Sequence, residues 1–269
     1  MALDFDPWLR LWRLTPDGEP FDSLAGRLMP VRAEGVPAML KLTEAPEEIA
    51  GGALMEWWAG EGAARVLARQ GGALLLERAL GSQSLADMSR NGRDPEAMSI
   101  LAAAAEQLHR PRASPPPASL KPLPDWFRAL WPSAQARGGV FHRAAAAARD
   151  LLAASGAPVV LHGDLHHGNL LDFAERGWLV IDPKGLLGDR GYDFANMVCN
   201  PDAPTALAPG VFEHRLDLVG QASGLGSRTL AAWVLAYCGL SASWTLDGGG
   251  DAWQALAIAE RAAAVLDGA

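Results

Sequence analysis

The stretch LHGDLHHGNLLDFAERGWLVIDP, residues 161–183, joins a polar loop to an apolar strand that ends on an acid. Asp164 and Asn169 lie in the loop, and Asp182 ends the strand. Phosphoryl transfer from ATP requires a base near the acceptor hydroxyl, oxygen ligands for magnesium, and cations along the phosphates. Asp164 is a candidate base, while Asp182 and Asn169 carry the carboxylate and carbonyl oxygens that Mg²⁺ prefers. The stretch therefore predicts a phosphoryl-transfer site.

The alternative for these residues is a capped loop in which Asn and Asp only form turns. Each residue taken alone favours that alternative, because both types are common turn formers. The ordered set of three favours the catalytic interpretation. A hairpin between strands 159–161 and 178–182 would bring Asp164, Asn169 and Asp182 to one edge.

The residues before this stretch divide into a small β-rich part and a helical part. Segments 26–33 and 37–42 predict a hairpin, because two apolar runs flank a Glu-Gly turn. Residues 47–69 are rich in Ala, Leu, Met and Trp and contain no proline, which predicts one helix with room for an interruption at its glycines. Residues 73–78 predict a buried strand. Further helices are expected at 96–109, 125–131, 141–154, 191–198, 228–238 and 251–266, with a proline-rich surface connection at 111–124.

The motif LHGDLHHGN, followed by an Asp at the end of a strand, resembles the catalytic and metal loops of the protein-kinase-like fold. The form HGDxxxxN with IDP is similar to the aminoglycoside phosphotransferase branch. Three stretches are similar to the streptomycin 6-kinase and hydroxyurea kinase group: VLHGDLHHGNLLDFAERGWLVIDPKGLLGDRGYDFANMVCNP, EWWAGEGAARVL at 56–67 and ALLLERAL at 73–80. The resemblance runs from about residue 22 to the C-terminus. It implies an α+β bilobal fold, with residues 1–80 as the nucleotide-binding lobe and 81–269 as the catalytic and substrate-binding lobe.

The resemblance also implies roles for single residues. Asp164 would be the catalytic base, and His162 would belong to the same catalytic loop and support it by hydrogen bonding. Asn169 and Asp182 would bind Mg²⁺ beside ATP. Lys41, at the end of PAMLKL, matches the strand lysine that contacts the α- and β-phosphates.

The chain departs from the family pattern at the partner of that lysine. Gly51 stands where a helix Glu is usual, so Glu47, Glu48 or Glu56 would have to substitute. We favour Glu48 because it lies just upstream of Gly51.

Other nucleotide contacts rest on less specific patterns. No GxGxxG loop is present, and FDSLAGRL, with Ser23 and Gly26, is the candidate for the nucleotide loop. Glu77 belongs to a strand that would enter the hinge beside adenine, or would simply lie in the core. Asp193 resembles the buried carboxylate that braces the catalytic loop, and Trp244 and Trp253 are candidates to face a substrate.

Composition and charge indicate a soluble protein and argue against a nucleic acid partner. The chain of 269 residues is 49% apolar and 20% charged, which is typical of a soluble globular protein. Residues 159–269 hold 13 acidic and 6 basic residues, a net charge of −7, which argues against nucleic acid. If the acceptor is a polycation such as an aminoglycoside, these acids should form a negative cleft beside Asp164, whereas acids scattered over the outer surface would favour a small neutral acceptor.

The N-terminus MALDFDPWLRLWRL does not resemble a signal peptide, and no apolar run is long enough to span a membrane. Cys199 and Cys238 provide no disulfide framework. We therefore expect a cytoplasmic, ATP- and Mg²⁺-dependent kinase of a small molecule. The acceptor would be streptomycin, hydroxyurea, or another metabolite or amino sugar; a nucleotide-binding pseudokinase is the remaining alternative.

Overall fold

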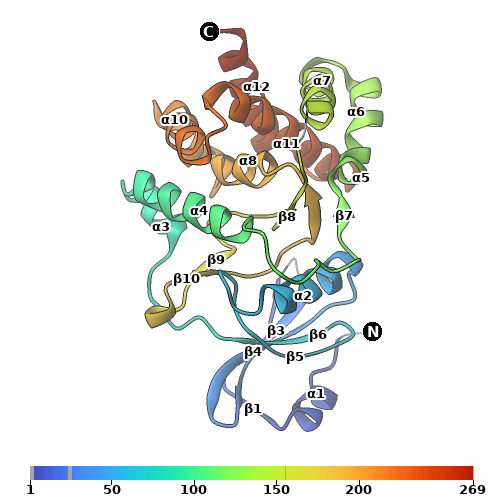
Figure 1. The fold of residues 1–269 in the computed structure, drawn as a ribbon, viewed down its shortest axis with the longest axis vertical. Helices are drawn as coiled ribbons and strands as arrows, with labels where there is room; N and C mark the ends of the chain where they lie inside the picture. Colours follow the sequence, from blue (N-terminus) through green and yellow to red (C-terminus); the bar gives the residue numbers. More distant parts are fainter. Residues whose placement is uncertain (1–2, 24–25, 155, 269) are drawn as a thin grey trace.

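Figure 1 shows a small lobe built on an antiparallel sheet and a larger helical lobe, in a computed structural model that describes residues 3–23, 26–154 and 156–268. The bilobal α+β fold predicted from the sequence is confirmed. The elements of the small lobe are α1 (Asp6–Leu11), β1 (Leu14–Pro16), β2 (Phe21–Ser23), β3 (Gly26–Ala33), β4 (Val36–Leu42), α2 (Pro46–Trp58), β5 (Val66–Gln70) and β6 (Ala73–Glu77). The sheet thus ends at Glu77, and a division between the lobes at residue 80 stays a prediction.

The sheet has the strand order β1-β3-β4-β6-β5, with β2 paired to β3, and its pairings are antiparallel. The predicted hairpin is confirmed: β3 and β4 pair from Arg27 with Leu42 to Ala33 with Val36. Glu34 and Gly35 both have positive φ, the conformation of a type I′ turn that matches the twist of the strands.

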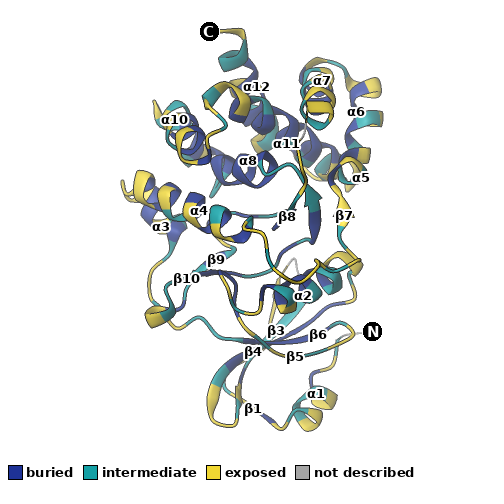
Figure 2. Cartoon of the chain, in the orientation of Figure 1, coloured by how far each residue is buried: buried dark blue, intermediate teal, exposed yellow. Residues whose placement is uncertain are grey.

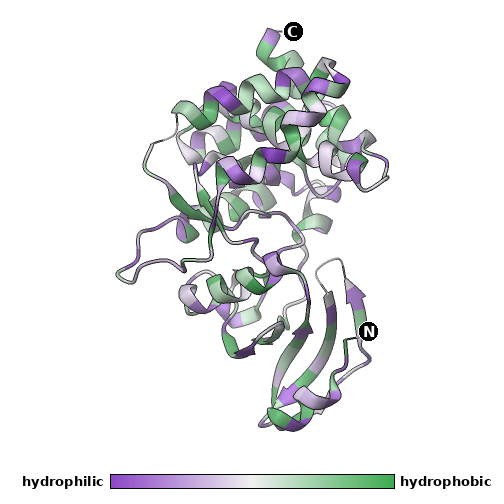
Figure 3. Cartoon of the chain, turned by 90° about the vertical axis from the view of Figure 1, so that its right-hand side faces the viewer, coloured by the Kyte–Doolittle hydropathy of each residue, from purple (hydrophilic) through white to green (hydrophobic). Residues whose placement is uncertain are grey.

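Alternation along the strands gives the sheet two different faces, and Figure 3 shows hydrophobic and hydrophilic segments along these strands. Leu40 and Leu42 of β4 pack with Leu75 of β6 in a core that α1 covers. Lys41 lies between those two leucines and therefore points to the opposite face. On that face Leu74 packs in the main core, to which α2 also contributes.

The predicted helix 47–69 is wrong in its second half. Helix α2 ends at Trp58, and Ala59, Gly60 and Gly62 all have positive φ, which breaks the helix and turns the chain into β5. Short apolar segments suit a helix and a buried strand equally well, so composition did not separate α2 from β5.

The larger lobe is mostly helical, and Figure 2 shows that its central helices are buried. Its helices are α3 (Leu85–Arg90), α4 (Asp94–Leu108), α5 (Leu123–Trp126), α6 (Leu130–Arg137), α7 (Gly139–Ala154), α8 (Gly191–Cys199), α9 (Ala203–Ala206), α10 (Val211–Ser223), α11 (Ser227–Asp247) and α12 (Trp253–Asp267), with 3₁₀ turns η1 (Phe127–Ala129) and η2 (Ala174–Arg176). Its strands are β7 (Lys121–Pro122), β8 (Val159–Leu161), β9 (Leu170–Asp172), β10 (Trp178–Val180) and β11 (Leu186–Gly188). Among the predicted helices, 125–131 is instead divided among α5, η1 and α6. Helices α3, α9 and α10 were not predicted.

Helix α11 forms the centre of this lobe. By length and composition alone it could cross a membrane, but 61% of its most apolar window is buried within the protein. It packs against α7, α8, α10 and α12, as the core helix of a helical lobe does.

The predicted hairpin between 159–161 and 178–182 is wrong. Strand β10 pairs with β9, and β8 pairs with β11, both antiparallel. The short run LLD at 170–172 supplies the nearer partner for β10, so the β9–β10 hairpin and the β8–β11 pair are separate. They still meet, because the backbone N–H of Ile181 donates to the Asn169 carbonyl at 2.9 Å, and that of Lys184 donates to the His162 carbonyl at 2.7 Å.

Candidate active site

One buried carboxylate, that of Asp193, anchors the loop that contains Asp164. Asp193, in the first turn of α8, accepts hydrogen bonds from the backbone N–H groups of His162 (2.9 Å) and Gly163 (2.8 Å), and from His109 Nε2 (2.9 Å). Burial acts to raise the pKa of Asp193, but the His109 hydrogen bond and the charges around it hold that pKa below its ordinary value. An ionised acceptor at the base of the loop fixes the backbone that leads into Asp164.

His162 is fully buried and supports the same loop from inside. Its Nε2 donates to the Ile181 carbonyl at 2.8 Å, and its Nδ1 accepts from the backbone N–H of Asp164 at 3.2 Å. Burial lowers its pKa, so the ring is neutral, as this pair of contacts requires. The geometry therefore gives His162 a positioning role rather than a chemical one.

The Asp164 carboxylate is partly exposed and oriented by two amides. Asn196 Nδ2 donates to Asp164 Oδ1 at 3.0 Å, and Asn169 Nδ2 donates to Oδ2 at 3.3 Å and to the Asp164 carbonyl at 2.8 Å. Asn196 was missed from the sequence. The signal was available, since it follows Asp193 by one helical turn in GYDFAN and so shares its face.

Asn169 and Asp182 lie next to each other through the hydrogen bond of Ile181 to the Asn169 carbonyl. Asp182 has a φ of 58°, a left-handed conformation that Asp tolerates better than most residues. The Asn169 amide nitrogen is bound to Asp164, so the amide oxygen is the end left for a cation. One amide oxygen beside one carboxylate is a donor set that fits Mg²⁺, which keeps water on its remaining positions.

Lys41 forms ion pairs with two carboxylates, those of Glu48 and Asp182. Its Nζ lies 2.6 Å from Glu48 Oε2 and 2.8 Å from Asp182 Oδ1, and its side chain is buried. Glu48 is thus the carboxylate that pairs with Lys41, as favoured from the sequence. A Glu at position 51 could not pair with Lys41 instead, because its Cβ would lie 1.9 Å from the Pro183 carbonyl oxygen. Helix α2 packs too closely on the segment after β10 for any side chain at that position.

A cavity of about 390 Å³ lies between the sheet and the β9–β10 hairpin. It is lined by Ser23, Lys41, Glu77, Asn169 and Asp182, which brings together the residues predicted to bind nucleotide and metal, except Glu48. Apolar side chains complete its wall, as adenine recognition requires. These are Phe21, Leu28, Met39, Leu76, Leu171, Phe173 and Ile181.

Ser23 and Glu77 contribute to this cavity in different ways. Ser23 is exposed at the end of β2 and its hydroxyl donates to the Gly26 carbonyl at 3.0 Å; Leu24 and Ala25 of the predicted nucleotide loop lie outside the described residues. The Glu77 carboxylate accepts from the backbone N–H of Arg65 and from Arg176, which joins the end of β6 to the β9–β10 hairpin. Glu77 therefore fixes the junction of the lobes.

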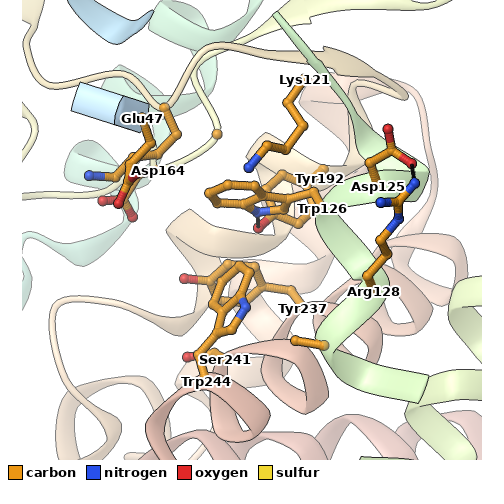
Figure 4. Close-up of a pocket in the computed structure, with 13 residues that line it drawn as sticks. Glu47, Lys121, Asp125, Trp126, Arg128, Asp164, Tyr192, Tyr237, Ser241 and Trp244 are labelled. Carbon is orange, nitrogen blue, oxygen red and sulfur yellow. Dashed lines mark hydrogen bonds and ion pairs between the residues drawn. The ribbon is translucent and has the colours of Figure 1, made fainter. Parts of the chain in front are cut away.

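A second cavity, of about 760 Å³, opens on the other side of Asp164. Figure 4 shows Asp164 and Glu47 on one side and a wall of aromatic rings facing them. The Trp126 and Trp244 rings meet edge to face at 5.0 Å. The aromatic wall also contains Tyr192 and Tyr237.

The charges in this cavity are balanced. Glu47, Asp125 and Asp164 line it together with Lys121, Arg128 and Lys184. Of the acids in residues 159–269, Asp164 is the one that lines it, and others such as Asp217 and Asp251 are exposed elsewhere. The negative cleft expected for a polycationic acceptor is therefore absent from the described residues. Trp244 does face the cavity, whereas Trp253 does not line it.

Comparisons with known proteins identify the family of the chain and its fold. Residues 11–249 match the family model described as aminoglycoside/hydroxyurea antibiotic resistance kinase. A streptomycin 3''-kinase from Klebsiella pneumoniae is 47% identical over 88% of this chain and 91% of its own length. A streptomycin 6-kinase from Streptomyces griseus is 32% identical over 88% of this chain and 80% of its own. In fold, aminoglycoside phosphotransferase APH(4)-Ia, solved with ADP and hygromycin B, superimposes with a TM-score of 0.65 over 97% of both chains at 13% identity.

Proposed function

The chain belongs to the aminoglycoside/hydroxyurea antibiotic resistance kinase family, and from that premise we propose that it transfers the γ-phosphate of ATP to the 3''-hydroxyl of streptomycin. One structural observation carries the proposal. Asp164 lines the larger cavity, while Asn169, which donates to it, lines the cavity that also holds Lys41 and Asp182. A base is thus available to an acceptor in the larger cavity, and it is hydrogen-bonded to a residue that lines the smaller cavity.

In this mechanism the acceptor hydroxyl approaches Asp164 from the larger cavity and its oxygen attacks the γ-phosphorus. The bond from that phosphorus to the ADP oxygen breaks, and the hydroxyl proton passes to the Asp164 carboxylate. Asn196 and Asn169 hold the two carboxylate oxygens in place while this happens. Lys41 meets the phosphates from the sheet.

Asn169 and Asp182 would hold Mg²⁺, and Lys41 already neutralises part of the Asp182 charge at 2.8 Å. When bound, the metal would offset the charge that develops on the phosphate oxygens. The chain itself contributes a dry and fixed setting, since the Lys41 and Glu48 side chains are 3% and 4% exposed.

The position on streptomycin is proposed from similarity, because identity to the 3''-kinase is 47% and to the 6-kinase 32%. The larger cavity suits a multi-ring acceptor, since drug-sized ligands occupy about 300–1,000 Å³. Its cationic groups would be met by aromatic faces as well as by Glu47 and Asp125, because a guanidinium is attracted to the face of Trp or Tyr.

Hydroxyurea is the second candidate acceptor. The balanced charge of the cavity favours a neutral molecule, and the family description includes it. Its small size does not fill about 760 Å³, so we rank it below streptomycin. For location we propose the cytoplasm, because Cys199 and Cys238 are free thiols.

The proposal is tested by incubating the purified chain with ATP, Mg²⁺ and each acceptor. ADP release that depends on streptomycin, with phosphate located at the 3''-oxygen by NMR, supports it. Release that depends on hydroxyurea alone would replace the acceptor, and phosphate at the 6-position would correct the site of transfer.

A further inference from the structure

A second lysine, Lys184, shares Glu48 with Lys41. The Glu48 carboxylate contacts Lys41 through Oε2 and Lys184 through Oε1. The two lysines differ in the cavity they line: Lys41 lines the smaller, nucleotide cavity, and Lys184 lines the larger, acceptor cavity. One buried carboxylate therefore holds one lysine in the wall of each cavity.

The main chain fixes Lys184 beside the base. Its backbone N–H donates to the His162 carbonyl at 2.7 Å. Gly163, with a φ of 83°, comes directly before Asp164, and a Cβ built there would lie 3.1 Å from the Lys184 Cβ. The start of the Lys184 side chain thus packs against the residue that precedes the base, where only glycine fits.

The Lys184 ammonium forms an ion pair with the Glu48 carboxylate and lines the larger cavity. The Lys184 side chain is 20% exposed, so it is accessible from the cavity that it lines. A charged group held in a partly dry site acts on nearby charge more strongly than one in water.

We infer that Lys184 is a further catalytic residue, which stabilises the phosphoryl group during transfer from the acceptor side. Resting on the proposed function, this inference assigns Lys41 to the bound phosphates and Lys184 to the phosphoryl group as it leaves ADP. The acceptor oxygen–phosphorus bond forms, the phosphorus–oxygen bond to ADP breaks with its electron pair on ADP, and the proton goes to Asp164. Lys184 gains or loses no proton in the step; it offsets charge on the oxygens in transit.

The competing explanation is that Lys184 only ties α2 to the catalytic loop through Glu48. The two explanations separate in the kinetics of Lys184→Met, Lys184→Gln and Lys184→Arg. If Lys184 stabilises transfer, its loss in the Met and Gln variants should lower kcat by about 10²–10³ with little change in the KM for ATP. The removal of one oxyanion donor has an effect of this size. Lys184→Arg keeps the charge and should recover part of the loss. Lys184→Gln keeps a donor for Glu48 and guards against misfolding of the Met variant.

A binding measurement gives a readout besides turnover. The variants should bind a non-hydrolysable ATP analogue as the wild type does, but should lose affinity for ADP with aluminium fluoride, which mimics the phosphoryl group in transit. A structural tie predicts instead that both affinities fall together with the melting temperature, and that result would overturn the inference.

Failure of the proposed acceptor is distinguishable from failure of this inference. If the wild type transfers nothing to streptomycin, the acceptor proposal falls, and the slow hydrolysis of ATP by water provides the same comparison of variants. If the wild type is active and Lys184→Gln keeps its kcat, the inference is wrong.

Discussion

The Lys41 ammonium lies 2.8 Å from the Asp182 carboxylate, although 141 positions separate the two residues in sequence. Lys41 comes from the sheet of the small lobe, and Asp182 lies two residues after the end of β10 in the larger lobe. Glu48 completes the contact from α2. This ion cluster joins the two lobes beside the smaller cavity.

Lys41→Met keeps the apolar stem and removes the charge. We expect the KM for ATP to rise by about 10- to 100-fold, since a charge-assisted hydrogen bond contributes about 1.5–3 kcal/mol. Steady-state kinetics at varied ATP measure this. Arg69→Met is the matched control, because Arg69 lies in the same sheet and pairs with Glu56 outside the nucleotide cavity. Equal kinetics in Lys41→Met and wild type would assign the phosphates to another cation.

Asp182→Ala should abolish the magnesium dependence of nucleotide binding, and Asn169→Ala should weaken it, because both residues supply oxygen ligands. Titration calorimetry with ADP, with and without Mg²⁺, measures the difference. Tight binding to Asp182→Ala that still depends on Mg²⁺ would show that other groups hold the metal.

Trp244→Ala should raise the KM for streptomycin by roughly 5- to 30-fold, because a cation over an aromatic face gains about 1–2 kcal/mol when it is partly desolvated. Trp253→Ala is the control, since Trp253 is exposed and does not line the cavity. If both variants raise the KM equally, the aromatic wall does not bind the acceptor.

The balanced charge of the acceptor cavity predicts that the KM for streptomycin changes little with salt. Screening weakens attraction between distant charges as the Debye length falls from about 30 Å at 0.01 M to about 8 Å at 0.15 M. Contact with rings is much less sensitive. A steep rise in KM over this range would mean that scattered acids steer the acceptor after all.

His167 gives a prediction for stability against pH. Its Nε2 is hydrogen-bonded to Ser89 Oγ at 3.0 Å, and burial, with the charge of Arg215, lowers its pKa from 6.5 to about 3. Below pH 6.5, His167 therefore binds a proton in the unfolded chain but stays neutral in the folded chain. The free energy of unfolding falls as pH falls for this reason. One such group contributes up to about 1.4 kcal/mol per pH unit. Urea unfolding between pH 6.5 and 4.5 should show a shallower slope in His167→Gln, and an equal slope would contradict a neutral His167.

The sequence predicted what depends on local pattern. The hairpin predicted over 26–33 and 37–42 put Lys41 on a strand, and the position just upstream of Gly51 indicated Glu48. The roles of the site residues stay predictions, but the positions of Asp164, Asn169 and Asp182 around one junction follow from the motif. Family membership followed from the same residues and is confirmed.

What could not be predicted depends on packing between distant segments. Lys184 meets Glu48 across 136 positions, with no spacing rule that links the pair. Asn196 could have been placed on the helix face of Asp193, but its contact with Asp164, 32 positions away, could not have been predicted from spacing. Net charge was also a poor guide, because the acids of the C-terminal part lie mostly outside the acceptor cavity.

Asp164→Asn tests the central claim most directly, because it keeps the shape of the side chain and removes the base. Phosphorylation of streptomycin should fall by about 10²–10⁴ in kcat, the usual contribution of general-base catalysis, while ATP affinity stays within a few fold. Asp217→Asn, which alters an exposed acid on α10, should leave kcat unchanged. Turnover near that of the wild type in Asp164→Asn would contradict the account and remove Asp164 from the chemistry.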